Sequence, residues 1–383
     1  MKYVSTLSVE EFRSALKKTF DASAPRGHIP ELSQATVFCS KDSCTIACTN
    51  LTQWCQTTIP AQGDAFSLTF YDTRKLLDAC SYFSGELRLE FYSNDSQSTS
   101  GRTSDNEVSI ISNGRELHQL SLASDLIPPP KEFHPDHVYT INAGTFSNMF
   151  RQIQHAVSDD QNRPGTCCAQ FIGNKMFALD GYRLSVRTIP GFYAEKPFLI
   201  PRKAMELLSV FGEADCTLSV GTEYMSVKNG STRLTSRIPA EEPFPLESAI
   251  PTTFSTECVV EVSSVQKAMR YLIKMSGSRF GREKKPVRLS DGHFSICGNT
   301  GLYRATAALD PIPDIEIGYN PRYLLEAFES LSLKMSGTVK MGFTTPVGPT
   351  LLTDEAGRME MILPVRLKDE TPKFYHIQQS GAA

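Results

Sequence analysis

The sequence predicts an α+β protein built from three copies of one domain, because three features recur in the same order in each third of the chain. They are a strand followed by an amphipathic helix, then a hairpin, then a second strand and helix. Their interval of about 120–130 residues is too long for a solenoid repeat, so each copy is a whole domain. The marker residues are Phe12, Phe146 and Val265 for the first feature, Asn50, Asp180 and Asn299 for the second, and Arg74, Arg202 and Arg322 for the third.

Each feature is justified by its pattern of apolar residues. The strand and helix pairs show a short alternating run followed by helical spacing, and the hairpins place turn residues between two alternating runs. Both halves of a copy run strand, helix, strands, which is the order expected if each copy is itself doubled. The first strand and helix are expected at 3–20, 138–157 and 258–275, the hairpins at 45–57, 177–189 and 295–307, and the second strand and helix at 67–80, 197–210 and 315–328.

Proline-rich connectors mark the domain boundaries, because proline lacks the donor that a sheet needs and stiffens the chain. They are IPPPKEFHP at 127–135 and EEPFPLESAIP at 241–251. A polar insertion at 93–107 interrupts the repeat and is expected to be a mobile surface loop. The predicted division is 1–130, 131–251 and 252–367 for the three domains, with a flexible tail at 368–383.

Composition and charge indicate a soluble protein of the cytoplasm. No stretch approaches the roughly 20 apolar residues that span a bilayer, and the start MKYVSTLSVEEF lacks the pattern of a signal peptide. The net charge of −3 argues against a protein coated with basic charge but leaves room for a local basic surface. We expect no membrane contact and no cofactor.

The ten cysteines are expected to be reduced core residues, since a long chain without a secretory signal does not need disulfide bonds for stability. Zinc is the alternative, because Cys44 and Cys48 are four residues apart with Cys39 and Cys55 nearby. The group lacks a CxxC pair, which argues against a metal site. The cysteines that lie inside strand-like runs are Cys39, Cys48, Cys216, Cys258 and Cys297.

The hairpin FALDGYRLSV at 177–186 has two interpretations. Asp180-Gly181 accepts the positive φ angles of a tight turn, and the flanking alternation fits half-buried strands, so a plain turn explains it locally. The other interpretation is a site, and the choice depends on the rest of the chain.

Basic residues are concentrated on the expected helices, although the whole chain is acidic. The segment from Val262 to Arg282 holds five basic residues and no acidic one. For one helix alone, a solvated face is the more common explanation, but repetition in different copies favours a polyanion partner. No base-reading motif accompanies these residues, which predicts phosphate contacts without sequence preference. The basic residues on other helices are Arg13, Lys17, Lys18, Arg74, Lys75, Arg202 and Lys203.

An enzyme is the alternative from another class. Ser14-Ala15-Leu16-Lys17 and Ser264-Val265-Gln266-Lys267 match the SxxK motif of penicillin-recognising acyl enzymes. Both fall on the same helix of different copies, and no SDN or KTG motif follows. No P-loop, GxSxG or HExxH motif is present either, so no active site is predicted. A peptide-binding scaffold that does not bind DNA is a further alternative.

Several motifs together resemble the bacterial DNA polymerase III beta subunit, the sliding clamp. They are ALDGYRLSVR followed by LIPRKAMELL, YDTRKLLDAC in the first copy, Arg163-Pro164 ahead of the middle hairpin, and MILPVRL at 361–367. The resemblance runs from about residue 1 to Leu367. It implies three clamp domains per chain, each with two helices packed on antiparallel sheets, and a head-to-tail dimer that closes into a ring of six domains.

The resemblance also implies a non-catalytic function. The ring would encircle double-stranded DNA without sequence specificity and keep the replicative polymerase on its template. The implied partners are a second copy of the chain, the polymerase alpha subunit, the clamp loader, and other polymerases or repair proteins. The candidate DNA-facing residues are Arg26, Arg202 and Lys203 by match to the family, and Arg74, Lys75, Lys267, Arg270 and Lys274 by charge and repeat position.

In the family, the turn of the middle hairpin and the last strand form an apolar groove that binds short linear peptides from partners. On this basis the Asp-Gly hairpin is both a turn and a site. Small and aliphatic walls suit a hydrophobic anchor, and Gly181 lets a peptide approach the backbone. The implied groove residues are Thr166, Leu179, Gly181, Tyr182, Arg183, Leu184, Pro245, Val347, Met361, Ile362, Leu363, Pro364, Val365 and Arg366.

The subunit contact is expected between the first domain of one chain and the third domain of the other. By position, Leu120 and Leu122 lie on one side, and Met275 and Phe280 on the other. Ordinary core positions are an equally good explanation for these four residues.

Overall fold

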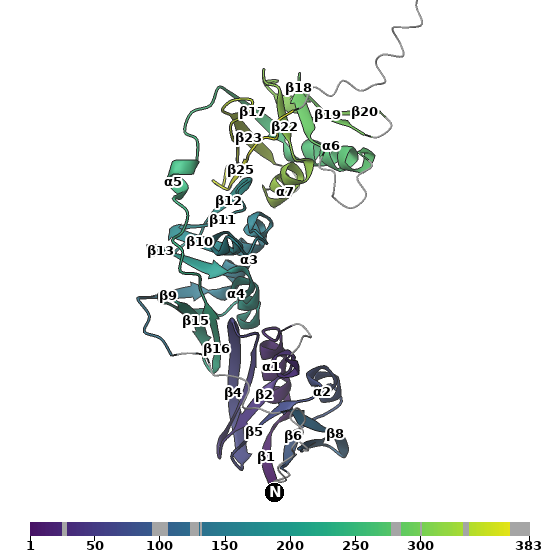
Figure 1. Cartoon of the computed structure of the whole chain (residues 1–383), viewed down its shortest axis with the longest axis vertical. Helices are drawn as coiled ribbons and strands as arrows, with labels where there is room; N and C mark the ends of the chain where they lie inside the picture. The colour runs from purple at the N-terminus through teal and green to yellow at the C-terminus, as the bar shows by residue number, and fades with distance from the viewer. Residues whose placement is uncertain are drawn as a thin grey trace, which may run out of the picture. The chain divides into compact units, whose positions relative to one another are not determined.

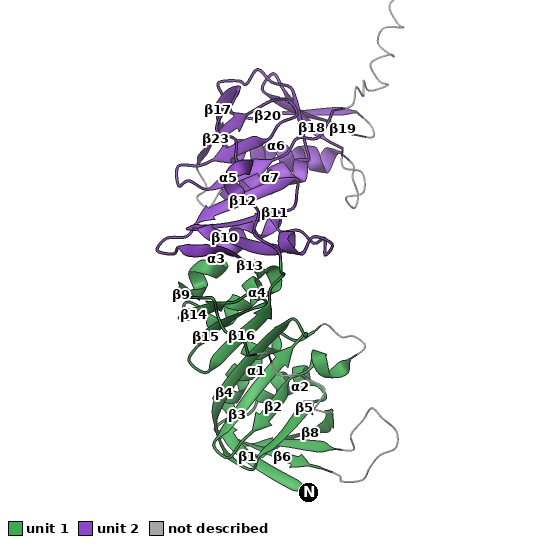
Figure 2. Ribbon diagram, turned by 60° about the vertical axis from the view of Figure 1, so that its left-hand side comes forward, with its two compact units in different colours: residues 1–147, 200–240 green, residues 148–199, 241–383 purple. Residues whose placement is uncertain are grey.

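The computed structural model (Figure 1) describes residues 1–24, 29–93, 106–122, 130, 132–276, 285–298, 301–331 and 337–367. The candidates Arg26 and Phe280, the marker Asn299, most of the 93–107 insertion and the 368–383 tail lie outside these residues. The chain divides into two compact units, one of residues 1–147 and 200–240 and one of 148–199 and 241–383 (Figure 2). The three cuts, after residues 147, 199 and 240, all fall inside the predicted central domain, and the three-domain boundaries therefore stay a prediction.

The element order repeats a strand–helix–three-strand half six times, two halves to each copy. The halves of the first copy follow one another directly. They are β1 (Lys2–Ser8), α1 (Val9–Phe20), β2 (Thr36–Cys39), β3 (Ser43–Thr49) and β4 (Gln53–Gly63), then β5 (Phe66–Phe70), α2 (Thr73–Cys80), β6 (Glu86–Tyr92), β7 (Glu107–Ser112) and β8 (Arg115–Leu122).

The second copy follows the same order. Its first helix ends earlier than the sequence predicts, and a short 3-10 helix at Gln154–Ala156 continues the segment. The halves are β9 (His137–Asn142), α3 (Ala143–Ile153), β10 (Cys168–Gly173), β11 (Lys175–Leu179) and β12 (Arg183–Thr188), then β13 (Ala194–Pro201), α4 (Arg202–Leu207), β14 (Asp215–Val220), β15 (Tyr224–Asn229) and β16 (Thr232–Arg237).

The third copy adds one short strand, β21 (Leu309–Asp310), between its halves. The connector before it holds a one-turn helix, α5 (Leu246–Ala249), where the sequence predicts only a linker; Leu246 is buried, which explains why this part of the connector is folded. The halves are β17 (Thr256–Glu261), α6 (Val262–Met275), β18 (Val287–Ser290), β19 (His293–Cys297) and β20 (Leu302–Thr306), then β22 (Ile317–Tyr319), α7 (Pro321–Leu331), β23 (Thr338–Phe343), β24 (Thr350–Thr353) and β25 (Met359–Ile362).

Within each copy the two halves exchange their first strands. Strand β1 pairs with β6 of the other half, while β5 pairs with β2, and the other copies follow the same rule. Every half therefore completes its sheet with a strand from its neighbour. The result is three sheets. One has twelve strands with β1 and β9 at its ends, one has nine strands with β13 and β21 at its ends, and one has four strands in the order β20-β19-β18-β22. Neighbouring strands such as β1 and β6, β17 and β23, and β18 and β22 are antiparallel.

Helix α1 illustrates why these segments fold as they do. The Ser8 hydroxyl accepts a hydrogen bond from the Glu11 amide at 3.5 Å, and this caps the helix. Glu10 and Glu11 stand in the first turn and Lys17 and Lys18 in the last, which matches the helix dipole. The apolar stripe is buried against the sheet, as is the stripe Val265, Met269 and Leu272 of α6.

The hairpin alignment drawn from the sequence is wrong by one residue in the third copy. Leu179 faces Leu184 across the middle hairpin, and Cys297 faces Leu302 across the last one. Leu302 is therefore equivalent to Leu184, whereas matching Asp180 with Asn299 would have made Tyr303 equivalent. The match of Asp180 with Asn299 rested on the likeness of two polar side chains. The register of a hairpin is fixed by its backbone pairing, which gives the other equivalence.

All ten cysteines are free thiols, as the sequence predicts, although Cys167 and Cys297 are only half-buried. Burial raises the pKa of the Cys55 thiol to about 12 and that of Cys258 to about 11. Within the described residues, no cluster of potential metal ligands is present. None of the helices in that part of the chain is long and apolar enough to cross a membrane.

Candidate functional site

The Asp-Gly pair forms the turn between β11 and β12. Gly181 has φ +89°, a conformation that other residues rarely adopt. The Asp180 carboxylate accepts hydrogen bonds from the amides of Tyr182 at 2.9 Å and Arg183 at 3.1 Å. The sequence motif thus specifies a rigid turn, which exposes 63% of Tyr182 at its tip.

This turn lies beside the last strand of the chain. Arg183 of β12 faces Ile362 of β25, and Leu184 faces Met361. Beyond β25, the amide of Leu363 donates to the Tyr182 carbonyl at 2.8 Å. Two segments almost 180 residues apart are brought together here, as the resemblance implies.

An apolar cluster fills the sheet face between them. Leu184 is buried with Phe177, Val186 and Leu246 of α5, and partly buried residues pack around them, including Leu179 and Met361. Leu363 and Val365 follow the end of β25 and keep part of their side chains exposed. The buried members stabilise the sheet, whereas the exposed ones offer apolar surface to a ligand.

Arg183 has a structural role rather than a free cationic end. Its side chain is 12% exposed, and its Nε donates to Asp180 at 3.0 Å. Its terminal nitrogens donate to the Glu326 carboxylate and the His155 carbonyl, and its guanidinium lies 4.2 Å from the Tyr323 ring centroid. This arginine fixes the hairpin to α7, so its truncation would disturb the fold as well as the groove.

The flanking candidates are connected to the hairpin to different degrees. Thr166 ends a short turn that begins at Arg163, and Gln170 joins this turn to the connector by donating to the Gly165 carbonyl and accepting from the Phe244 amide. Pro245 follows Phe244 and is exposed. Val347 is exposed in the turn between β23 and β24, and β24 pairs with β25. Pro364 is half-buried and Arg366 is exposed beyond β25.

A buried charge network that the sequence did not predict lies beneath this surface. Arg187 is 1% exposed and donates to Glu360 at 2.7 Å, to Gln152 and to Ser330. Glu360 also accepts from Ser185 at 2.6 Å, and His155 Nε2 lies 3.1 Å from its other oxygen. The signal was available, since Arg183, Ser185 and Arg187 alternate onto one face of β12. A single sequence does not show that this face of β12 is buried in the folded protein.

Burial by itself raises the pKa of Glu360, because a charged carboxylate loses its hydration. The hydrogen bond and charge of His155, the charge of Arg187 and the Ser185 hydroxyl outweigh that effect and hold the pKa below its ordinary value. Glu360 is therefore an ionised partner inside the protein.

The basic candidates lie on helices in both units. In α1, α2, α3, α4 and α6 basic residues outnumber acidic ones, whereas α7 carries Arg322 against two glutamates. Helix α6 has three basic residues and no acidic one. Arg74, Lys75, Lys267, Arg270 and Lys274 are exposed, and Arg202 and Lys203 are partly buried. Of these, Arg270 pairs with Glu329 at 2.8 Å and Lys203 lies 3.9 Å from Glu206.

The structure gives no sign that the serines of the two SxxK motifs act as nucleophiles. Ser264 donates to the Glu261 carbonyl at 3.0 Å and accepts from the Ala308 amide at 2.9 Å. Both bonds fix the start of α6, which supports a structural role. Ser14 is exposed on α1.

Three of the proposed subunit-contact residues are described: Leu120 and Leu122 lie at the end of β8, and Met275 lies at the end of α6. Leu120 is exposed and Leu122 is buried, although both lie on β8. Met275 is half-buried at the last position of α6. The contact itself stays a prediction.

The chain is similar to known sliding clamps, although no family model matches it. It is 22% identical over 396 residues to the beta sliding clamp of Lactococcus lactis, a match that covers 94% of this chain and 98% of the relative. It is also 22% identical over 282 residues to the beta sliding clamp of Chlamydia muridarum, covering 69% of this chain and 75% of the relative.

Solved structures extend the similarity to the fold. The beta subunit of the DNA polymerase of Streptococcus pyogenes superposes with a TM-score of 0.78 at 19% identity, and the match covers 95% of this chain and all of that one. The DNA polymerase sliding clamp of Bacillus subtilis gives 0.77 at 18% identity, with 96% of this chain and all of that one covered. The chain therefore has the sliding-clamp fold, and both comparisons confirm its resemblance to the DNA polymerase III beta subunit.

Proposed function

We propose that this protein is a DNA sliding clamp, a non-catalytic processivity subunit of a replicative DNA polymerase that acts in the cytoplasm. The observation that carries the proposal is the clamp fold over about 95% of the chain. Two copies, each with the predicted domains 1–130, 131–251 and 252–367, form a head-to-tail ring around double-stranded DNA. A heterologous contact that closes after two chains leaves no unpaired surface for further growth.

The distribution of charge supports DNA binding through the helices. Basic residues outnumber acidic ones on five helices of a chain with net charge −3. Helices presented to the phosphate backbone give attraction without base readout, which suits a protein that moves along any sequence. The proposed DNA contacts are Arg26, Arg74, Lys75, Arg202, Lys203, Lys267, Arg270 and Lys274.

Retention on DNA of different topology tests encirclement. The protein is loaded on nicked circular DNA by its clamp loader, and the amount bound is measured before and after the circle is linearised. A ring slides off free ends, so retention is expected to fall on linear DNA and to persist on the circle. Equal retention on both would favour a DNA-binding protein that does not encircle, and no retention on either would favour a peptide-binding scaffold.

We further propose that Tyr182, Leu363 and Val365 bind the short linear peptides of partners. The partners are the polymerase alpha subunit, the clamp loader and other polymerases or repair proteins. Support comes from the exposed apolar side chains above a buried apolar cluster, because a hydrophobic anchor gains most where the surrounding wall is rigid. Thr166, Leu179, Gly181, Leu184, Pro245, Val347, Met361, Ile362 and Pro364 complete the proposed groove, with Arg183 and Arg366 at its edge.

Binding of a peptide from the C-terminus of the cognate polymerase subunit tests this groove. The double variant Leu363→Ala with Val365→Ala removes exposed side chains without touching the Arg183 network. It is expected to weaken the peptide Kd by about 10- to 100-fold, since hot-spot truncations cost about 2 kcal/mol or more. Ile312→Ala, which removes another exposed aliphatic side chain, is the matched control. An unchanged peptide Kd in the double variant would refute the placement.

A further inference from the structure

Two pairs of cysteines face each other in the sheet of the first copy. Cys39 at the end of β2 faces Cys44 of β3, and Cys48 of β3 faces Cys55 of β4. All four thiols are free and buried. The zinc alternative for this group finds no support, because the described residues hold no cluster of potential metal ligands. What the pairs can do therefore depends on the placement of their sulfur atoms.

The pair of Cys39 and Cys44 has the geometry of a disulfide precursor. Their Sγ atoms lie 3.5 Å apart. Next to them, the Ser40 amide donates to the Ser43 carbonyl at 2.7 Å. Because hydrogen-bonded and non-hydrogen-bonded pairs alternate along an antiparallel ladder, the cysteine pair beside this bond is non-hydrogen-bonded. Such pairs bring their β-carbons closest together, and a disulfide needs β-carbons about 3.5–4.5 Å apart.

The pair of Cys48 and Cys55 lies in the same sheet but in the other kind of position. The Asn50 amide donates to the Gln53 carbonyl at 3.2 Å. The two cysteines are two positions further along this ladder and are therefore a hydrogen-bonded pair, whose β-carbons are more widely spaced. The Cys55 thiol donates instead to the Lys18 carbonyl at 3.8 Å. The chain thus contains a matched internal control for the first pair.

We propose that Cys39 and Cys44 form a redox-sensitive modification site, at which a peroxide converts the two thiols into a reversible disulfide. This inference does not depend on the proposed function. Disulfides of cytosolic proteins are usually transient and redox-sensing, so a facing thiol pair in a chain with no other disulfide suits this role.

Cys39 is the thiol that reacts first. The hydrogen bond from Cys44 lowers the pKa of Cys39, and the Ser5 hydroxyl adds to this effect, although burial opposes it. The same contact with Cys39, together with burial, raises the pKa of Cys44. Since the thiolate is the nucleophile, the two members of the pair have different roles.

The reaction has two steps. The Cys39 thiolate attacks one oxygen of hydrogen peroxide, which breaks the O–O bond and gives a sulfenic acid and one water. The Cys44 sulfur then attacks the Cys39 sulfur, the S–O bond breaks, and a second water leaves with the Cys44 proton. Two thiols are oxidised to one disulfide, and one peroxide is reduced to two waters.

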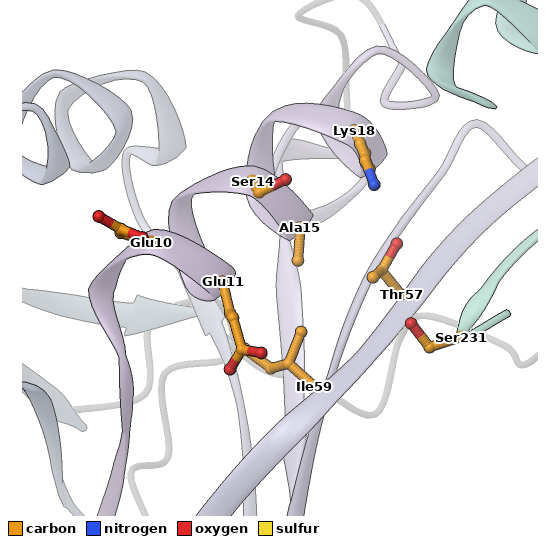
Figure 3. A pocket seen from close by; sticks show the side chains of 8 residues that line it. All are labelled: Glu10, Glu11, Ser14, Ala15, Lys18, Thr57, Ile59 and Ser231. Carbon is orange, nitrogen blue, oxygen red and sulfur yellow. The ribbon is translucent and has the colours of Figure 1, made fainter. Parts of the chain in front are cut away.

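A small oxidant can approach this pair. Cys39 keeps 7% of its surface exposed at the end of β2. Ile59 of β4 faces Cys44 and lines a pocket of about 300 Å³ beside α1 (Figure 3). The pocket thus extends to the cross-strand neighbour of the second thiol. These narrow openings favour hydrogen peroxide over a bulky oxidant such as oxidised glutathione.

The disulfide would be easy to reduce again. It closes a loop of the four residues 40–43. Cross-linking stabilises a protein less when the closed loop is shorter. A weakly stabilising disulfide near the surface belongs with the labile, regulatory ones rather than with structural ones.

Mass spectrometry of the oxidised full chain tests the proposal without any variant. The reduced protein is treated with hydrogen peroxide, the remaining thiols are alkylated in denaturant, and tryptic peptides are analysed. Trypsin cuts after Lys41, so the disulfide appears as two linked peptides. The bond between Cys39 and Cys44 is expected to form at least about tenfold faster than one between Cys48 and Cys55, since one unit of pKa changes the thiolate fraction by about this factor. Dithiothreitol should then restore both thiols.

Single variants separate the roles of the two thiols. In Cys44→Ser the sulfenic acid of Cys39 has no partner and is expected to be trapped by dimedone, whereas Cys39→Ser should leave Cys44 unlabelled. Cys48→Ser is the matched control and should form the disulfide at the wild-type rate. Circular dichroism checks that each variant is folded. Equal oxidation of both pairs, or no disulfide in the folded wild type, would overturn the proposal.

Discussion

Arg187 and Glu360 form a fully buried ion pair that ties the middle hairpin to the last strand. Removing one partner of such a pair leaves the other charge buried without compensation. Arg187→Leu is therefore expected to lower the free energy of unfolding by about 3–5 kcal/mol. Urea denaturation measures this free energy of unfolding. Lys340→Leu is the control, because the exposed ion pair of Lys340 with Glu257 contributes at most about 1 kcal/mol. Equal effects of the two variants would contradict the argument.

The depressed pKa of Glu360 sets the pH dependence of that stability. A carboxyl whose pKa is lower in the folded state stabilises the protein above its unfolded pKa of about 4.3, and the contribution is lost as pH falls through the folded value. His155→Leu removes one cause of the depression. The variant is expected to be less stable than the wild type near neutral pH, with a difference that shrinks as the pH falls below about 4. Stability curves at several pH values check this, and a constant difference would refute it.

At the residue level, single residues were predicted best where local chemistry determines conformation. Asp180-Gly181 forms a turn because of its backbone geometry, and the Asp-Gly dipeptide alone was enough to predict it. The role of Arg183 was not readable, since Asp180, Glu326 and Tyr323 that hold it come from three different segments. A sequence shows which charges exist, but folding decides which of them are already paired.

Helix α6 carries the strongest basic charge of any described helix. If it faces DNA, Lys267→Ala with Lys274→Ala removes two exposed cations and two counterion-releasing contacts. The slope of log affinity against log salt concentration is expected to fall in magnitude by about 1.8, at about 0.9 per phosphate contact. Lys340→Ala is the control, since this exposed lysine lies on β23. An unchanged slope in the double variant would place α6 away from DNA.

At the level of elements, strands and helices were largely predictable, while their boundaries and pairings were not. The six helices follow from apolar spacing, and α5 was missed because its single turn depends on the burial of Leu246. The one-residue error at Asn299 arose because side chains suggested an equivalence that the backbone pairing of Cys297 with Leu302 contradicts. Long-range pairing such as β12 with β25 has no local signal.

On the scale of the whole molecule, the repeat made the architecture predictable, because duplicated domains repeat their patterns. A dimeric ring predicts a solution mass of about twice 42.4 kDa, or about 85 kDa, at concentrations above the dimer Kd. Light scattering over a dilution series measures it. A mass that stays near that of one chain, or one that grows without limit with concentration, would contradict closure after two chains.

The exchange of first strands between halves has a consequence for how this chain can change. A half that is cut away would lose one strand of its own sheet and present an open edge, and another half would be the natural source of the missing piece. The copy, not the half, is thus the smallest unit that can be gained or deleted intact. Deletions or insertions of a few residues should be tolerated in turns and connectors. Excision of a single half should yield a fragment that associates with other copies through its open edge.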